Sequence, residues 1–161
     1  MITAYWFFGD TLRDGRPVPP DGKWLEHTGP LKLRESGLHA SKHPFDALKY
    51  APGPNLALVE AEGHIVHGHD KLCASRRRVI ARFDASELLR TFARKQALSV
   101  VHLWDAPQIV REYLETGNES KRSAAESAAW SAWSAAESAA RDTFREAVEA
   151  KFAEILAEGR P

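Results

Sequence analysis

The clearest hydrophobic pattern lies in the last quarter of the chain, where apolar residues recur with the spacing of a helix. No glycine or proline occurs between Ser120 and Glu158, and strong helix formers fill the segment. Eleven residues make close to three helical turns, so an eleven-residue spacing keeps a stripe on one side of a helix. Trp133, Phe144 and Ile155 follow this spacing, Val148 and Phe152 widen the stripe, and Trp130 lies beside it. The pattern predicts one continuous helix over residues 120–158, about 60 Å long.

Shorter patterned segments precede this helix. Runs rich in β-branched and aromatic residues predict strands, and capped apolar runs predict short helices. The expected strands are Ile2–Phe8, Leu56–Ala61, His64–His67 and Cys73–Phe83, and the expected helices are Pro44–Tyr50, Glu87–Lys95 and Gln108–Glu115. Asp10–Gly29 has the composition of a loop, and Leu98–Trp104 fits either a strand or a buried helix. The fold class is therefore α+β: a small mixed or antiparallel sheet with a few short helices, followed by one long C-terminal helix.

The pattern changes near Thr116–Asn118 and divides the chain into two parts. We expect a compact α+β domain over residues 1–117 and a long alanine-rich helix over residues 118–161. A lone helix that exposes two tryptophans would be only marginally stable, so its apolar stripe requires a partner. The prediction is a homo-oligomer, most simply a dimer, formed through the helix. The alternative is intramolecular, with the stripe packed on the helices of residues 87–115.

Charge and composition narrow the function classes. The 22 lysines and arginines balance 22 aspartates and glutamates, which argues against a dedicated nucleic-acid-binding or anionic-membrane-binding protein. Cys73 is the only cysteine, so no internal disulfide can form and a reducing compartment fits. No segment approaches the roughly 18 apolar residues of a membrane span, and the N-terminus lacks the features of a signal peptide. We therefore expect a cytoplasmic location and no membrane contact.

His39 is the first candidate for chemistry. It lies between Gly37 and Ala40, small neighbours that leave room for a ligand. A histidine can hydrogen-bond a ribose or act as acid or base near neutral pH. The alternative is a structural histidine that bonds a backbone carbonyl. The usual signatures of phosphate-binding loops, dinucleotide-binding folds, serine hydrolases and zinc proteases do not occur in the sequence.

Two further groups of polar residues have a spacing that is less specific for a binding site. The group His64, His67, His69 and Asp70 has part of a zinc-binding pattern. A polar hairpin around Gly68 explains this group better, so no metal is predicted. Arg76 and Arg78 share one face of a strand, with Arg77 on the other. Arg76 and Arg78 could bind the phosphate groups of a ligand, or they could form a solvated strand edge.

Two stretches resemble an uncharacterised domain family of phage and bacterial proteins. The first contains SGLHAS at residues 36–41, DALKY at 46–50, VEAEG at 59–63 and the pair Asp70–Lys71. In that family a G-[FL]-H-A segment precedes a short helix, a V-E-x-x-G strand and a D-K pair. The second stretch, residues 102–117, leads into an alanine- and tryptophan-rich helix, as in the relatives. The resemblance covers most of the chain and implies no activity.

A looser resemblance connects the GLHAS segment, the following helix and the next strand with the core of ADP-ribosyltransferase-like folds. Those proteins bind NAD in a cleft between two small sheets. The resemblance implies that His39 holds the nicotinamide ribose, that Tyr5 or Tyr50 positions the ring, and that Glu60 or Glu62 is the polarising carboxylate. These carboxylates come early in the chain, so a non-catalytic version of the fold is equally compatible. The residues alone establish no cofactor; NAD or a related nucleotide is what the resemblance implies.

Two functions from different classes follow. In the first, a small accessory protein of a phage or mobile element oligomerises through its C-terminal helix and binds a host protein, such as a defence component. In the second, an ADP-ribosyltransferase-like protein binds or uses NAD or a related nucleotide. The long helix favours the first function, and the His39 segment favours the second. Because no acid–base pair can be assigned, the sequence favours binding over catalysis.

Overall fold

The computed structural model describes the backbone of residues 1–103, 106 and 108–158, and the side chains of these residues except 109 and 124–139. Contacts group the chain into two compact units. Unit 1 contains Met1–Ala85 and the end of the C-terminal helix from Arg145 onward, and unit 2 contains Ser86–Phe144. The C-terminal helix thus contributes to both units. That residues 1–117 form a domain of their own, separate from this helix, stays a prediction.

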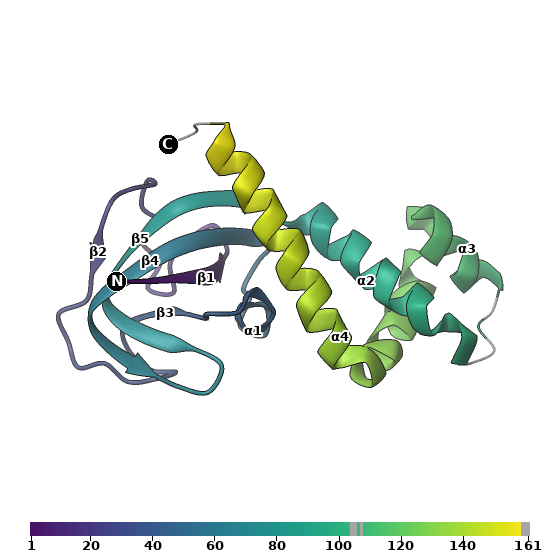
Figure 1. The fold of residues 1–161 in the computed structure, drawn as a ribbon, viewed down its shortest axis with the longest axis horizontal. Coiled ribbons are helices and arrows are strands. Elements are labelled where there is room, and N and C mark those ends of the chain that lie inside the picture. Colours follow the sequence, from purple (N-terminus) through teal and green to yellow (C-terminus); the bar gives the residue numbers. More distant parts are fainter. Residues whose placement is uncertain (104–105, 107, 159–161) are drawn as a thin grey trace. The chain divides into compact units, whose positions relative to one another are not determined.

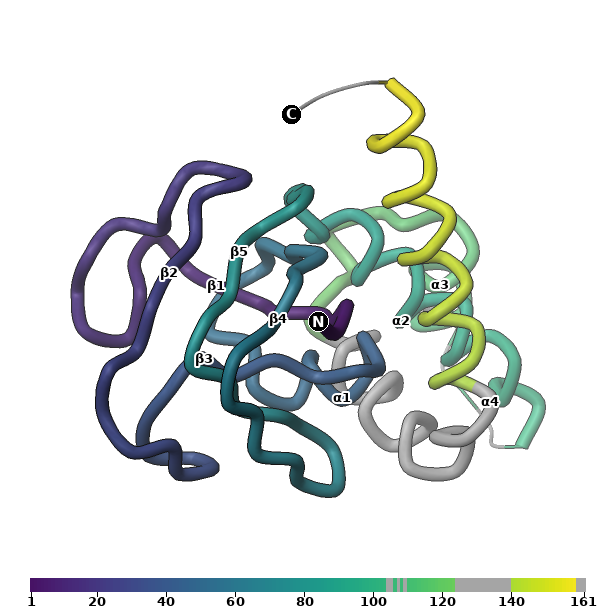
Figure 2. The backbone as a smooth tube through the Cα atoms, turned by 60° about the vertical axis from the view of Figure 1, so that its left-hand side comes forward, coloured from purple at the N-terminus to yellow at the C-terminus, as the bar shows by residue number. Residues whose placement is uncertain are grey.

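An antiparallel sheet of five strands forms the centre of unit 1 (Figure 1). The strands are β1 (Ile2–Phe8), β2 (Leu25–Glu26), β3 (Leu38–Ala40), β4 (Asn55–His67) and β5 (Leu72–Asp84). β4 and β5 form a long hairpin, in which the two strands bend together (Figure 2). β1 pairs with the free side of β4, and β2 and β3 pair with successive parts of β5. The predicted α+β class with a small antiparallel sheet and a C-terminal helix is confirmed.

The sheet closes on itself. Ser41, which directly follows β3, pairs with Tyr5 of β1 through two backbone hydrogen bonds of 2.7 and 2.9 Å. Pairing therefore runs from β1 through β4, β5 and β3 back to β1. A closed sheet of so few strands has little room inside, and small side chains accordingly fill much of its inner face. The buried core residues there are Ala4, Phe8, Ala40, Ala57, Val59, Ala61, Leu72, Ala74 and Val79.

The two strands expected at Leu56–Ala61 and His64–His67 are one strand, β4. Gly63 lies within it at a φ of 77°, and the register with β5 shifts between Glu62 and Ile65. A Cβ atom at Gly63 would lie 2.3 Å from the Oγ of Ser75. Glycine therefore lets a bulge close tightly against β5. The bulge bends the strand without ending it, which is why a glycine that suggested a break lies inside a continuous strand.

Two helices complete unit 1. Helix α1 (Pro44–Leu48) has His43 as its N-cap, with the ring Nδ1 accepting the N–H of Phe45 at 3.2 Å, and proline at its first position as predicted. Helix α4 (Arg122–Ala157) contributes its last turns. The ring of Phe152 on α4 lies 6.2 Å from the ring of Tyr5 and 5.3 Å from that of Phe83. The end of α4 therefore packs on the outer face of the sheet, the face opposite the closed core.

Unit 2 is helical. It contains α2 (Ser86–Val100), a 3-10 turn (Val101–Leu103), α3 (Gln108–Thr116), a second 3-10 turn (Glu119–Lys121) and the first part of α4. Its core includes Ala97, Val110, Tyr113 and Leu114. The rings of Phe92 and Phe144 add a contact between α2 and α4, with their centroids 5.0 Å apart. The segment that fitted either a strand or a buried helix is helical as far as Leu103, because it continues α2 into the 3-10 turn.

The apolar stripe of the C-terminal helix is covered within the chain wherever its side chains are described. Phe144 and Val148 are fully buried, Phe152 is 3% exposed, and Ile155 is half-buried. Phe144 packs on Phe92 of α2, as the intramolecular alternative predicted for the helices of residues 87–115. Phe152 packs instead on Tyr5 and Phe83 of the sheet, which that alternative did not predict. The side chains of Trp130 and Trp133 lie outside the described residues. Self-association through the helix stays a prediction.

Candidate functional site

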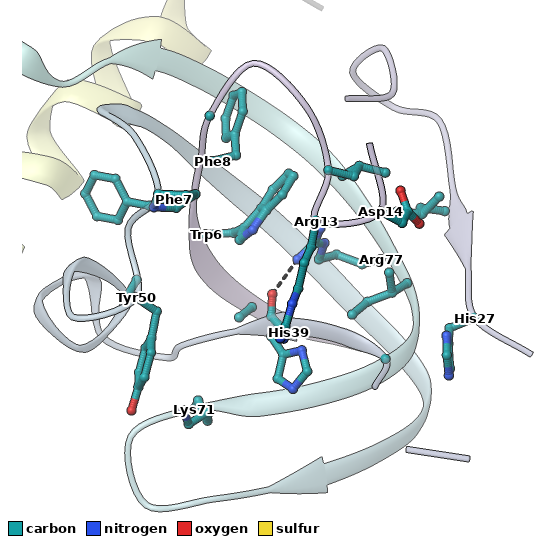
Figure 3. Close-up of a pocket in the computed structure, with 18 of the residues that line it drawn as sticks. Trp6, Phe7, Phe8, Arg13, Asp14, His27, His39, Tyr50, Lys71 and Arg77 are labelled. Carbon is teal, nitrogen blue, oxygen red and sulfur yellow. Dashed lines mark hydrogen bonds between the residues drawn. The ribbon is translucent and has the colours of Figure 1, made fainter. Parts of the chain in front are cut away.

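A pocket of about 1060 Å³ opens on unit 1 between segments that are far apart in the sequence. Its walls come from β1 and the loop that follows it, from β2, from residues 34–41 with β3, and from the end of α1. Lys71 in the turn before β5 and Arg77 in the middle of β5 complete the lining. Figure 3 shows the rings of Trp6 and Phe8 on one side of β1, with Arg77 and His39 beside Trp6, and the ring of Phe7 on the other side of the strand. The closure of the sheet brings these segments together, because it returns the residues after β3 to β1.

Arg77 is the most unusual residue of the pocket. It is only 5% exposed, although it lines the pocket. One N–H, on Nη1, donates to the carbonyl oxygen of His39, and the guanidinium carbon lies 3.7 Å from the centroid of the Trp6 ring. Burial lowers the pKa of Arg77 to about 9, so the group is still charged at neutral pH. Among the described residues no carboxylate forms an ion pair with it.

More positive charge surrounds the pocket. The Nζ of Lys71 lies 3.4 Å from the centroid of the Tyr50 ring, and the Tyr50 hydroxyl donates to Asp70 at 2.6 Å. The side chain of Arg13 lies close to His39 and Arg77 (Figure 3). Its Nη1 donates to the carbonyl oxygen of Arg34 at 3.1 Å. Three segments therefore supply cations to one concave surface.

Most of the acidic residues that line the pocket are already engaged. Asp14 pairs with Arg16 at 2.7 Å, and this hydrogen bond lowers the pKa of Asp14. Glu35 pairs with Lys32 at 3.2 Å. Glu26 pairs at 3.0 Å with Arg76, a residue outside the lining of the pocket. With Asp10 the lining holds four acidic residues against five lysines and arginines, so a small excess of positive charge remains.

His39 acts as an acceptor in the wall of the pocket. Its Nε2 accepts the backbone N–H of Arg34 at 3.0 Å. Arg34 is the one described non-glycine residue with a positive φ, at 75°, so this hydrogen bond supports a turn that a side chain disfavours. Burial lowers the pKa of His39, and the charges of Lys71 and Arg77 lower it further. At neutral pH the ring is therefore uncharged and able to accept.

We expect the stability to depend on the protonation of His39. Because the pKa of His39 is below its ordinary value near 6.5 in the folded state, the unfolded chain binds this proton more tightly and stability falls as pH drops below about 6.5. His39→Gln provides the matched control, since the amide oxygen accepts the same hydrogen bond and does not titrate. Urea unfolding between pH 7.5 and pH 5 should show the free energy of unfolding of the wild type falling relative to that of the variant as the pH drops. A difference that stays constant with pH would contradict this assignment.

The structure brings together some of the residues predicted for the site. Tyr5, His39 and Tyr50 all line the pocket. The ring of Tyr5 also packs on Phe152, and its pKa is raised by burial and by the charge of Glu149. Tyr50 is 47% exposed and therefore accessible to a ligand.

Glu60, Glu62, Arg76 and Arg78 do not line the pocket. Arg78 binds Glu60 at 2.6 Å, and Arg76 binds Glu62 at 2.5 Å. Both guanidinium groups lie over the ring of Trp24, at 4.7 and 4.8 Å from its centroid. Successive side chains of a strand point to opposite faces, so these residues share the outer face and Arg77 alone of the three arginines reaches the pocket.

Sequence reasoning did not select Arg77, Trp6 or Lys71 for the site. The alternation along β5 already placed Arg77 on the face opposite Arg76 and Arg78. A charged residue on the core face of a strand is unusual, and this could have marked Arg77 as a candidate for the site. The contribution of Trp6 depends on the closure of the sheet, which no local pattern indicates.

The remaining candidates form no site of their own. Among the described residues, no group of three or more His, Cys, Asp or Glu side chains is arranged to hold a metal ion, and this includes the histidines of residues 64–69. Cys73 is buried, its Sγ donates to the carbonyl of Ser36 at 3.0 Å, and burial raises its pKa. None of the described helices combines the length and hydropathy that a membrane span requires.

Comparison with known proteins places the chain in one family. No curated protein and no solved structure gave a significant match to it. The sequence profile of one domain family matches residues 2–91, a range that contains every residue lining the pocket. Because the match covers more than half of the 161 residues, the chain belongs to the family described as Domain of unknown function (DUF7666).

Proposed function

We propose that the protein binds a nucleotide of the NAD type, or a related phosphorylated nucleotide, in the pocket of unit 1, and that it acts by binding without catalysis. The observation that supports this proposal is the combination of aromatic surface and positive charge in one pocket of about 1060 Å³. Ligand sites in proteins typically enclose roughly 300–1,000 Å³. A nucleotide, which has a flat ring at one end and phosphate at the other, needs both kinds of surface.

The aromatic part of the pocket is suited to a base or a nicotinamide ring. The rings of Trp6 and Phe8 stack with their centroids 4.9 Å apart. Tyr50 adds a third ring, held by the cation of Lys71 on its face and by its hydrogen bond to Asp70. Stacking of a base on such a ring stabilises binding by about 1–3 kcal/mol. Because Tyr50 is held from two sides, little side-chain entropy would be lost when a ligand stacks on it.

Binding is favoured over catalysis because the carboxylates expected to take part in catalysis lie on the outer face of the sheet, away from the pocket. Glu60 and Glu62 form ion pairs on the outer face of the sheet. His39, the candidate acid or base, already uses its Nε2 to accept the N–H of Arg34. A general base must reach the proton that it removes, and these groups are engaged elsewhere.

A ligand screen tests the proposal. We expect NAD, ADP-ribose or ADP to raise the melting temperature, with binding confirmed by calorimetry. Tyr50→Ala should weaken binding roughly tenfold, the loss expected for one stacking contact. Trp24→Leu removes an aromatic residue outside the pocket and should bind like the wild type. If none of these nucleotides changes the melting temperature at millimolar concentration, the proposal is wrong.

The other functional hypotheses stay predictions. Binding of a host protein by a phage or mobile-element accessory protein would require an exposed surface, and Phe144, Val148 and Phe152 of the apolar stripe are buried in the chain. Sedimentation of the wild type and of Trp133→Glu tests self-association through the remaining part of the helix. Transfer of ADP-ribose would appear as label incorporated from NAD into an acceptor protein.

A further inference from the structure

A buried charge without a counter-charge destabilises a folded protein, and Arg77 carries such a charge. Moving an isolated ion from water into a protein interior costs several kcal/mol unless a partner compensates it. The hydrogen bond to the His39 carbonyl and the contact with the Trp6 ring compensate part of this cost. The acid that acts electrostatically on Arg77 is the Cys73 thiol. Since burial raises the pKa of that thiol, it is uncharged at neutral pH.

The free donors of Arg77 are available to a ligand. Nη1 donates to His39, whereas Nε and Nη2 donate to no atom of the described residues. Arg77 is one of the residues that line the pocket, and we infer that these donors face it. Figure 3 shows Arg77 between Trp6 and His39, with the side chain of Arg13 beside it. A guanidinium presents its donors as a planar fork that matches two oxygens of a phosphate group.

The charges around Arg77 favour the same class of ligand. The cations of Arg13 and Lys71 line the pocket with it, and Asp14 and Glu35 are paired with their own cations. Low-dielectric walls increase the attraction of such a site for an anion. Arg77 therefore lacks a counter-ion in a pocket that is accessible to one.

We propose that Arg77 is the receptor for a phosphate or pyrophosphate group at the inner end of the pocket, so that the ligand enters with its phosphate first and its ring toward Tyr50. This inference rests on the proposed nucleotide-binding function and adds which end of the ligand is held and by which residue. Arg77 binds through Nε and Nη2 and keeps its bond to His39. The contact with Trp6 fixes the plane of the guanidinium.

Calorimetry with fragments of the ligand tests the receptor separately from the nucleotide pocket. For the wild type we expect inorganic pyrophosphate to bind and to compete with ADP-ribose, and adenosine to bind roughly 10- to 100-fold more weakly than ADP-ribose, the loss expected when charge-assisted hydrogen bonds are missing. If pyrophosphate binds and adenosine does not, the phosphate-receptor proposal is supported and the nucleotide-binding proposal is refuted. If adenosine and ADP-ribose bind with equal affinity, the receptor proposal is refuted and the nucleotide-binding proposal stands. If none of these ligands binds, both proposals are refuted.

Variants of Arg77 identify the residue. Arg77→Lys keeps the charge but loses the fork, so ADP-ribose should bind roughly tenfold more weakly while adenosine binding is unchanged. Arg78→Lys, next in the strand but on the outer face, is the matched control and should leave both affinities unchanged. Unchanged binding of ADP-ribose and pyrophosphate to Arg77→Lys would overturn the assignment. If Arg77→Lys does not fold, the competition by pyrophosphate in the wild type still decides whether the receptor exists.

Discussion

Gly37→Ala is expected to destabilise the protein by at least about 3 kcal/mol, because both the backbone and the space around it require glycine. The φ of Gly37 is 105°, a conformation that other residues rarely adopt. A Cβ atom there would lie 2.2 Å from the Sγ of Cys73 and 2.7 Å from Cδ2 of Leu31. Cys73 belongs to β5 and is fully buried, so it cannot move away freely. Urea unfolding measures the change.

Gly22→Ala separates the two causes. Gly22 has a φ of 78°, but a Cβ atom there would meet nothing within 4 Å. We expect this control to lose only about 1 kcal/mol, the cost of the backbone conformation. In the background of Gly37→Ala, the change Cys73→Ala removes the Sγ atom and should restore part of the stability. Equal losses for the two glycine variants would show that the packing of Gly37 against Cys73 is not as described.

Phe152→Ala is expected to destabilise the protein by about 3–5 kcal/mol, the usual loss for a buried phenylalanine. Phe152 is 3% exposed and joins the end of α4 to the sheet through the rings of Tyr5 and Phe83. Its removal leaves a cavity that neither ring can fill from a strand. Urea unfolding of the variant gives the loss directly.

Leu156→Ala is the control for Phe152. It lies one turn further along α4 and is 44% exposed, so we expect a loss below about 1 kcal/mol. If Phe152→Ala were as stable as Leu156→Ala, the end of α4 would not be packed on the sheet in solution. The intramolecular role of the apolar stripe would then be lost, and an interface between chains would regain support.

Much of the fold follows from local patterns in the sequence. The alternation of β1 and β5, the proline and N-cap of α1, and the absence of helix breakers after residue 120 each predict an element that the structure contains. These signals suffice because strand alternation and helix capping act within a few residues. β2 and β3 are only two and three residues long and have no local pattern that distinguishes them from a loop.

The candidate site was less predictable because it is assembled by tertiary contacts. Whether a residue lines the pocket depends on the pairing of Ser41 with Tyr5 and on the bulge at Gly63. His39 could be selected from its small neighbours, but its hydrogen bond to Arg34 depends on a turn with positive φ at a non-glycine residue. Glu60 and Glu62 were selected by analogy, and strand alternation places them on the outer face with Arg78 and Arg76.

A titration of the isotopically labelled wild type with ADP-ribose, followed by NMR, tests the central claim most directly. If the pocket of unit 1 binds the nucleotide, the indole N–H of Trp6 and the backbone amides of Gly37, His39 and Lys71 should shift together and saturate. The side-chain Nε–H of Arg78, which donates to Glu60 on the outer face, should shift much less. A spectrum without changes, or changes confined to residues of unit 2 such as Tyr113, would contradict the claim.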